Sequence, residues 1–162
     1  MTTRRQFLQT GLAGSLLLTV AGCGAPGDKP TGRQTVIAAL APVILDGALP
    51  KEAEARRRAV AATVDGVERA ITGLSLATQH EIGQLFDLLA FAPTRILVAG
   101  VWPAWDVALP EEIVTFLESW RHSRFDLLRT GYAGLHDLVL GAWYSQPDSW
   151  SAIGYPGPPL LK

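Results

Sequence analysis

The stretch KEAEARRRAVAATVDGVERAIT, residues 51–72, decides the fold class of this chain. Its larger aliphatic residues recur at spacings of four, three and four positions, at Val60, Val64, Val67 and Ile71. Such spacing places these side chains on one face of a helix. The charged residues of the stretch fall mainly on the other faces. We therefore predict an amphipathic helix that packs against a core.

Helical patterns continue on both sides of this stretch. Residues 34–45 are almost continuously apolar and contain one proline, which predicts a buried helix that kinks or restarts there. Residues 77–91 carry apolar side chains at helical spacing, with Ser75 or Thr78 as the N-cap. The apolar run at 94–101 fits a short helix or a strand, and periodicity does not separate the two.

Another helix is expected in the C-terminal half. Pro110, followed by two glutamates, is a strong start, because proline suits the first turn and acids complement the helix dipole. We predict that this helix runs to about Arg129. Gly131 and Gly134 would then bend the chain before a further helix at 135–144.

These elements together predict an all-α fold. The sequence contains no alternating strand series and no internal repeat, so we expect a single bundle of about five helices over residues 34–146. Residues 147–162 differ in character, since they hold four prolines and two glycines beside Trp150 and Tyr155. We predict that this segment is not helical and that its rings lie on the bundle or on another protein.

Composition narrows the class of protein. The 162 residues are 48% hydrophobic and 18% charged, with a net charge of −1, which predicts one folded domain. Because fourteen basic residues stand against fifteen acidic ones without clustering, we expect no nucleic-acid partner.

The sequence contains few residues or motifs that are typical of catalytic or cofactor-binding sites. A single cysteine excludes a disulfide framework within the chain, a cysteine-rich zinc site and an iron–sulfur cluster. There is no Gly-rich phosphate loop, GxSxG elbow or HExxH helix. His122 and Asp126, one helical turn apart, are more typical of a surface hydrogen bond than of a catalytic dyad. We predict no catalytic residue, no metal site and no cofactor bound by this chain.

The N-terminus has the features of an export signal. Arg4 and Arg5, followed by Phe7 and Leu8, precede an apolar stretch of about a dozen residues, too short to span a bilayer comfortably. The arginine pair and the weak hydrophobicity predict a twin-arginine signal peptide over residues 1–22. An ordinary Sec signal, with the arginines serving only as positive charge, is the alternative.

The end of this leader resembles a lipoprotein box. The residues VAGC end at Cys23, which would become the lipidated first residue of a periplasmic, membrane-anchored protein. Residues 23–33 would then form a flexible tether. Cleavage after Ala25, which would leave a soluble periplasmic protein, is the alternative.

The aromatic residues suggest a contact surface. All five tryptophans fall in the C-terminal half, and Trp120 is expected in the core. Tryptophan and tyrosine with nearby arginine are typical of interface centres. The candidate partner-binding residues are Trp102, Trp105, Arg121, Arg124, Trp150 and Tyr155. For Trp102, Trp105 and Trp150 a position in the core is the alternative.

Several segments together resemble a known family. The segments are FLESWRHSRFDLLRTGYAGLHDLVLGAWY at 116–144, the ending WSAIGYPGPP at 150–159 and the shorter APVILDGALP at 41–50. With the leader, they resemble small accessory subunits of periplasmic flavoprotein dehydrogenases. These are the gluconate 2-dehydrogenase subunit 3 type and, more distantly, the gamma subunit of bacterial FAD-dependent glucose and sorbitol dehydrogenases.

This resemblance implies a role without catalysis. In such complexes a GMC-type oxidoreductase binds FAD, and the small subunit carries the leader, so the folded partner crosses the twin-arginine translocase as a passenger. A c-type cytochrome often completes the complex. The resemblance implies that this chain escorts, assembles and anchors the dehydrogenase. A stand-alone periplasmic lipoprotein with a structural or small-ligand-binding role is the alternative, and an independent hydrolase is a more distant one.

Overall fold

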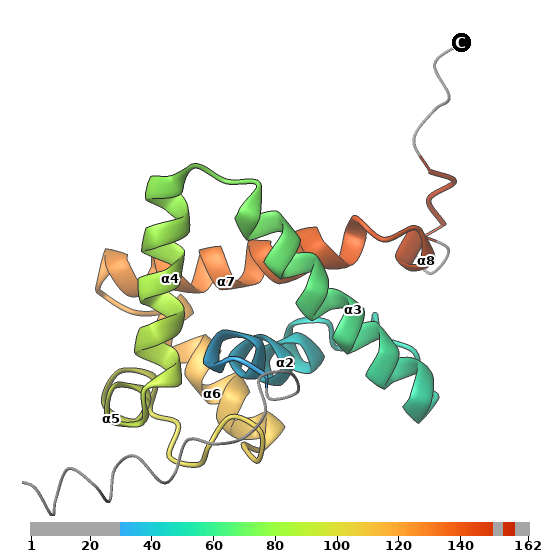
Figure 1. The fold of residues 1–162 in the computed structure, drawn as a ribbon. Helices are drawn as coiled ribbons and strands as arrows, with labels where there is room; N and C mark the ends of the chain where they lie inside the picture. Colours follow the sequence, from blue (N-terminus) through green and yellow to red (C-terminus); the bar gives the residue numbers. More distant parts are fainter. Residues whose placement is uncertain (1–29, 151–153, 158–162) are drawn as a thin grey trace, which may run out of the picture.

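The computed structural model describes residues 30–150 and 154–157 (Figure 1). Every regular element in these residues is a helical one, which confirms the all-α prediction. The leader positions Arg4, Arg5, Phe7 and Leu8 lie outside the described residues, and so does Cys23.

Five long helices make up most of the described chain. They are α2 (Gly32–Ile44), α3 (Ala53–Thr72), α4 (Leu76–Ala90), α6 (Pro110–Arg121) and α7 (Asp126–Tyr144). Three short elements accompany them: α5 (Ala92–Thr94), the π-helical turn η1 (Arg95–Ala99) and α8 (Pro147–Trp150).

Helix α2 lies at the centre of the fold. It contacts α3, α4, α6 and α7, and Figure 1 shows these helices grouped around it. Its inward residues Val36, Ile37 and Leu40 are fully buried, and each such side chain contributes about 1.5–3 kcal/mol of transfer free energy. The helix starts at Gly32, two residues before the predicted start, and continues without a restart through Pro42.

Helix α3 confirms the amphipathic pattern of residues 51–72. Val64, Val67 and Ile71 are buried, and Val60 is half-buried against the core. Glu52 is the N-cap, because its carboxylate accepts hydrogen bonds from the backbone N–H groups of the next turn, at 2.9 and 2.6 Å. These two bonds hold the pKa of the Glu52 carboxyl below its ordinary value.

Helix α4 leads into the part of the chain that periodicity left undecided. Ser75, the first of the two predicted caps, accepts a hydrogen bond from the Thr78 N–H at 3.2 Å. After Ala90 the chain bends by 80° and continues as α5 and η1, so the apolar run at 94–101 is helical over most of its length. Gly100, with a φ of 70°, ends the π-helical turn in a left-handed conformation.

Among the described helices, none alone is long and apolar enough to cross a membrane. Helix α4 and the segment Ala92–Ala99 together have the length and composition of a span, but they are bent by 80°.

The prediction of one helix from Pro110 to about Arg129 is wrong. Helix α6 ends at Arg121, and α7 begins at Asp126, so both predicted bend positions lie inside α7. Ser123 stabilises the break, because its hydroxyl accepts a hydrogen bond from the Phe125 N–H at 3.1 Å. The Ser123 carbonyl also accepts one from Arg129 at 2.6 Å.

The indole of Trp120 fixes the packing of α6 on α7. Trp120 is buried, as predicted, and a Cβ at Gly131 would lie only 2.7 Å from Cζ3 of its ring. The indole N–H donates to the carbonyl of Val98 at 3.0 Å, and the ring meets Phe116 edge-on at 4.9 Å. A side chain at position 131 would therefore displace a ring that is held on two other sides.

The C-terminal segment also departs in part from its prediction. Residues 147–150 form the short helix α8, whereas residues 154–157 have no helical structure, as expected. Proline at the first position of α8 suits a helix start because its missing N–H would have had no partner in the helix.

Two of the three glycines of α7, Gly131 and Gly134, provide a test of this packing. Gly131→Ala should lower the free energy of unfolding by about 1–3 kcal/mol, because the added methyl group collides with Trp120. Gly134→Ala in the same helix meets nothing within 4 Å and should raise it by up to about 1 kcal/mol through helix propensity. Chemical denaturation measures both values, and equal effects of the two substitutions would contradict the packing.

Candidate functional site

Trp105 belongs to the core rather than to a contact surface. Only 4% of it is exposed, and its indole N–H donates to the carbonyl of Leu89 at 2.7 Å. Its ring also meets Phe116 edge-on at 5.7 Å. The prediction that Trp105 contributes to partner binding is therefore wrong, because its side chain turns inward and is already satisfied.

Trp102, three residues earlier, points the other way. It is 73% exposed, although its backbone is firmly held. The buried guanidinium of Arg95 donates from Nε to the carbonyl of Val101 and from Nη2 to that of Trp102, both at 3.1 Å. The indole of Trp102 therefore stands in solvent on an anchored backbone, and its role in partner binding stays a prediction.

Trp102 is one of several large apolar side chains exposed on the same part of the chain. Phe91, Leu97 and Val98 are also exposed, Leu97 to 82%. We call these four residues the apolar corner. Concentrations of exposed apolar side chains are typical of binding surfaces in folded proteins. Sequence reasoning missed Phe91, Leu97 and Val98, because the outward face of a run cannot be chosen before its conformation is known.

A shallow groove adjoins the apolar corner. It runs between η1 and α6 and has a volume of about 370 Å³. Leu97, Val98 and Gly100 line one side, and Thr115 and Ser119 of α6 line the other. The surface here is therefore uneven, because exposed side chains of the apolar corner stand beside a groove.

The turn between α6 and α7 lies next to this corner. Trp120, which comes just before the turn, donates a hydrogen bond to the carbonyl of Val98. Arg121 is exposed and pairs with Glu118 at 3.3 Å. Arg124 is exposed too, and its guanidinium lies 4.7 Å from the centre of the Phe125 ring. Their partner-binding role stays a prediction.

The histidine of this turn does not pair with the predicted acid. His122 Nε2 lies 3.0 Å from the carboxylate of Glu118, whereas Asp126 pairs with Arg129. The interruption of the helix separates His122 and Asp126, which would be one turn apart only in a continuous helix. This part of the turn is a solvated ion-pair cluster.

Trp150 and Tyr155 pack on each other. Their ring centres are 5.4 Å apart in an edge-on arrangement, and the Trp150 N–H donates to the carbonyl of Tyr144 at 2.7 Å. A Cβ at Gly157 would lie 3.0 Å from the Trp150 ring. The two rings thus lie on their own segment and on the end of α7, and a partner-binding role for them also stays a prediction.

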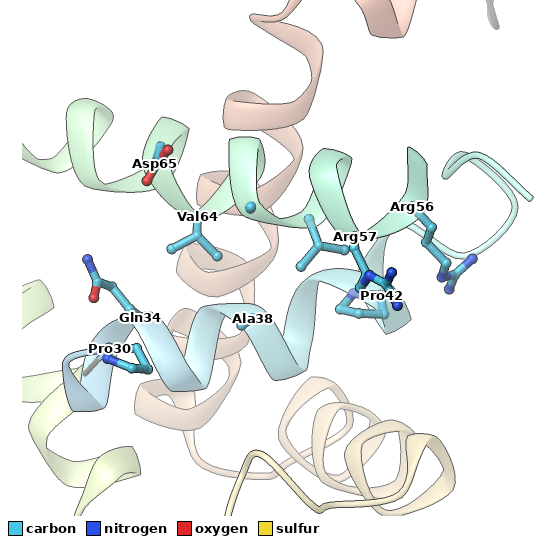
Figure 2. A pocket seen from close by; sticks show the side chains of 10 residues that line it. Pro30, Gln34, Ala38, Pro42, Arg56, Arg57, Val64 and Asp65 are labelled. Carbon is cyan, nitrogen blue, oxygen red and sulfur yellow. The ribbon is translucent and has the colours of Figure 1, made fainter. Parts of the chain in front are cut away.

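A larger groove follows the outer side of α2, between this helix and α3 (Figure 2). Its volume is about 610 Å³. We call it the α2 groove, and it is lined by Pro30, Gln34, Ala38, Pro42, Arg56, Arg57, Val60, Ala61, Val64 and Asp65. Most of its surface is apolar, because α2 presents small or apolar side chains there.

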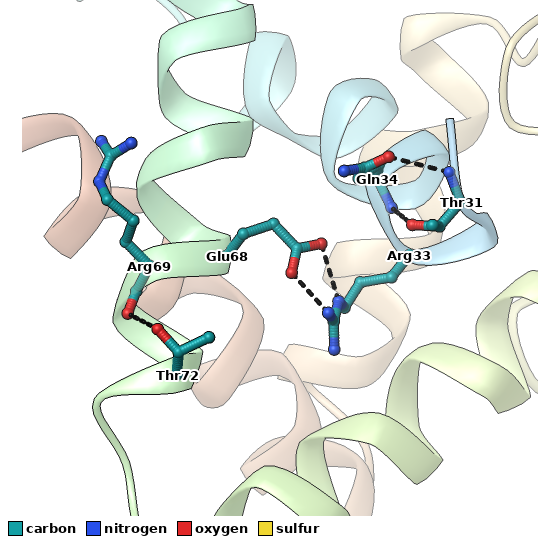
Figure 3. A network of polar contacts seen from close by, with 6 residues as sticks. All are labelled: Thr31, Arg33, Gln34, Glu68, Arg69 and Thr72. Atoms are coloured by element: carbon teal, nitrogen blue, oxygen red, sulfur yellow. Dashed lines mark hydrogen bonds and ion pairs between the residues drawn. The ribbon is translucent and has the colours of Figure 1, made fainter. Parts of the chain in front are cut away.

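An ion pair joins the two helices that form this groove (Figure 3). Arg33 of α2 donates from Nε and Nη2 to the two carboxylate oxygens of Glu68 on α3, at 2.9 and 2.5 Å. Thr31 and Gln34 cap the start of α2 beside it by reciprocal hydrogen bonds. Charge-assisted bidentate pairing fixes orientation as well as distance, so the N-terminal end of α2 is held against α3.

Among residues 30–150 and 154–157, no group of three or more His, Cys, Asp or Glu side chains could hold a metal ion. No protein-family model, no curated protein and no solved structure matches this chain.

The two indoles near the apolar corner should respond differently to substitution. Trp102→Ser should change the free energy of unfolding by less than about 0.5 kcal/mol, because the side chain is in solvent. Trp105→Phe should lower it by about 1–3 kcal/mol, because the buried carbonyl of Leu89 loses its donor. Chemical denaturation distinguishes the two, and a larger loss from Trp102→Ser would refute their assignment to surface and core.

Proposed function

We propose that this chain is an exported, non-catalytic accessory subunit that escorts, assembles and anchors a GMC-type FAD-dependent dehydrogenase in the periplasm. The observation that carries the proposal is the apolar corner. Four large apolar side chains within residues 91–102, Trp102 and Leu97 foremost, are exposed to solvent. A partner that covers them would remove this surface from water, which is the main driving force of stable association.

The rigidity of the apolar corner supports this role. Arg95 holds the backbone of Trp102, and Trp120 holds that of Val98. Association costs free energy whenever loops and side chains must be ordered, and a surface fixed in advance avoids part of that cost. The corner is thus organised for binding before any partner arrives.

The leader and the resemblance supply the rest of the proposal. A twin-arginine leader at Arg4 and Arg5 would take the folded, FAD-loaded partner across the membrane as a passenger of this chain. Lipidation of Cys23 would then anchor the complex, since several acyl chains give stable membrane attachment. The flavin would be bound by the partner, and a c-type cytochrome subunit could receive its electrons.

The stand-alone lipoprotein with a small-ligand-binding role remains the second candidate. One observation favours it, because the 610 Å³ volume of the α2 groove falls within the roughly 300–1,000 Å³ of typical small-molecule sites. Such a lipoprotein would purify from its membranes without a flavoprotein.

Purification from native membranes tests the proposed function. The C-terminally tagged chain is extracted in a mild detergent, and the visible absorption spectrum of the eluate is recorded. We expect a yellow eluate that contains a larger flavoprotein in equal amount. A colourless eluate with a single species would overturn the accessory-subunit proposal in favour of the stand-alone lipoprotein.

The double substitution Arg4→Lys and Arg5→Lys should keep both this chain and the flavoprotein in the cytoplasm. Lysine preserves the positive charge that a Sec leader needs, so the substitution separates the two export routes. Cell fractionation with flavin fluorescence measures the distribution of the partner. Normal export of the flavoprotein would refute the escort role, and normal export of this chain would favour the Sec route.

A further inference from the structure

The outer side of α2 is concave on both flanks. A second groove of about 380 Å³ runs along its other side and shares Pro30, Gln34, Ala38 and Pro42 with the α2 groove. The loop before α6, including Asp106 and Ala108, forms the far wall of this second groove. The shared line of Pro30, Gln34, Ala38 and Pro42, with one polar side chain among them, therefore lies between two walls.

The shape of the α2 groove suits a helix. From Pro30 to Pro42 it follows α2 over roughly 18 Å, about three turns. Ala38 leaves its floor low, and Val64 of α3 faces it from the opposite wall (Figure 2). Val60 of α3 also lines the groove, so this wall is apolar. An amphipathic helix that lies in a groove buries only its apolar face, so it matches a trough that is open along its length.

The charges at the two ends of the groove differ in sign. Arg56 and Arg57 lie at the end marked by Pro42, and Asp65 lies at the end marked by Gln34 (Figure 2). Arg57 is paired with Glu54, but Arg56 is half-buried and has no ion-pair partner in the described chain. A negative group beside Arg56 would complete this end of the groove.

These charges select an orientation for a bound helix. The C-terminal end of a helix carries partial negative charge and its N-terminal end partial positive charge. The first would face Arg56, and the second would face Asp65. A bound helix would therefore run parallel to α2.

The α2 groove is also linked to the apolar corner. The loop that exposes Trp102 continues into Asp106 and Ala108, which line the second groove on the far side of α2. One partner that covers the corner and follows this loop reaches the second groove and, through the four residues that both grooves share, the edge of the α2 groove.

We propose that the α2 groove receives an amphipathic helix of the escorted flavoprotein, parallel to α2, with an acidic residue or its C-terminus beside Arg56. This inference rests on the proposed function, because it assigns the partner's contact within that complex. With this contact in addition to the one at the apolar corner, the flavoprotein would cover both the corner and the α2 groove.

A photo-crosslinking amino acid at Ala38 tests the occupant. The tagged full-length chain is produced in its native host, irradiated, purified and analysed by mass spectrometry. The matched control places the same amino acid at Thr130, an exposed position of α7 that lines none of the three grooves. We expect a crosslink from position 38, and none from position 130, to a helix-forming amphipathic segment of the flavoprotein.

A charge reversal tests the orientation. Arg56→Glu should reduce the flavoprotein that co-purifies by on the order of tenfold, because it places like charges together. Arg58→Glu makes the same change two positions along α3, outside the groove lining, and should leave the yield within about twofold. Equal effects of the two reversals would overturn the proposed orientation.

The outcomes separate this inference from the function on which it rests. A yellow eluate without a crosslink from position 38 overturns the inference and leaves the accessory-subunit function standing. A crosslink to the chain's own residues 11–22 or to a second copy also overturns it. An eluate without a flavoprotein overturns both the function and the inference.

Discussion

The contact of the Trp120 indole with Gly131 is the constraint on which the rest of the fold depends. Because position 131 has no side chain, the ring can lie directly on the backbone of α7. The same ring meets Phe116 and bonds to Val98, so one side chain ties α6 to α7 and to η1. The relative position of α6, α7 and Val98 of the apolar corner therefore rests on this one indole.

The loop after η1 shows how the chain keeps an apolar surface exposed without loosening its backbone. Trp105 fills the core, whereas Trp102 stands in solvent, and the buried guanidinium of Arg95 holds the backbone between η1 and these rings. The buried guanidinium of Arg95 satisfies backbone carbonyls of the loop, while the apolar side chain of Trp102 remains exposed and available for binding. This loop therefore combines a buried polar group with exposed apolar side chains, which reverses the usual distribution.

The sequence predicted those helices whose buried face is already visible in the apolar spacing of their own segment. The apolar face of residues 51–72 is continuous, so the core positions of α3 followed from spacing alone. The break after Arg121 was missed, because the hydrogen bonds of Ser123 with Phe125 and Arg129 that stabilise it leave no trace in the apolar periodicity. Trp105 was misplaced for a similar reason, because periodicity cannot orient side chains in a turn. The α2 groove arises from small residues on one helix facing a wall on another, which no single segment reveals.

The separation of the indoles gives the protein an optical property. Trp105, Trp120 and Trp143 are buried, Trp150 is half-buried, and Trp102 alone of the five stands largely in water. Indole emission shifts to longer wavelengths in water and is quenched by solutes that can reach the ring. The long-wavelength, quenchable part of the protein's fluorescence therefore comes mainly from a residue of the apolar corner. A molecule that covers the apolar corner would therefore change the emission of Trp102 directly.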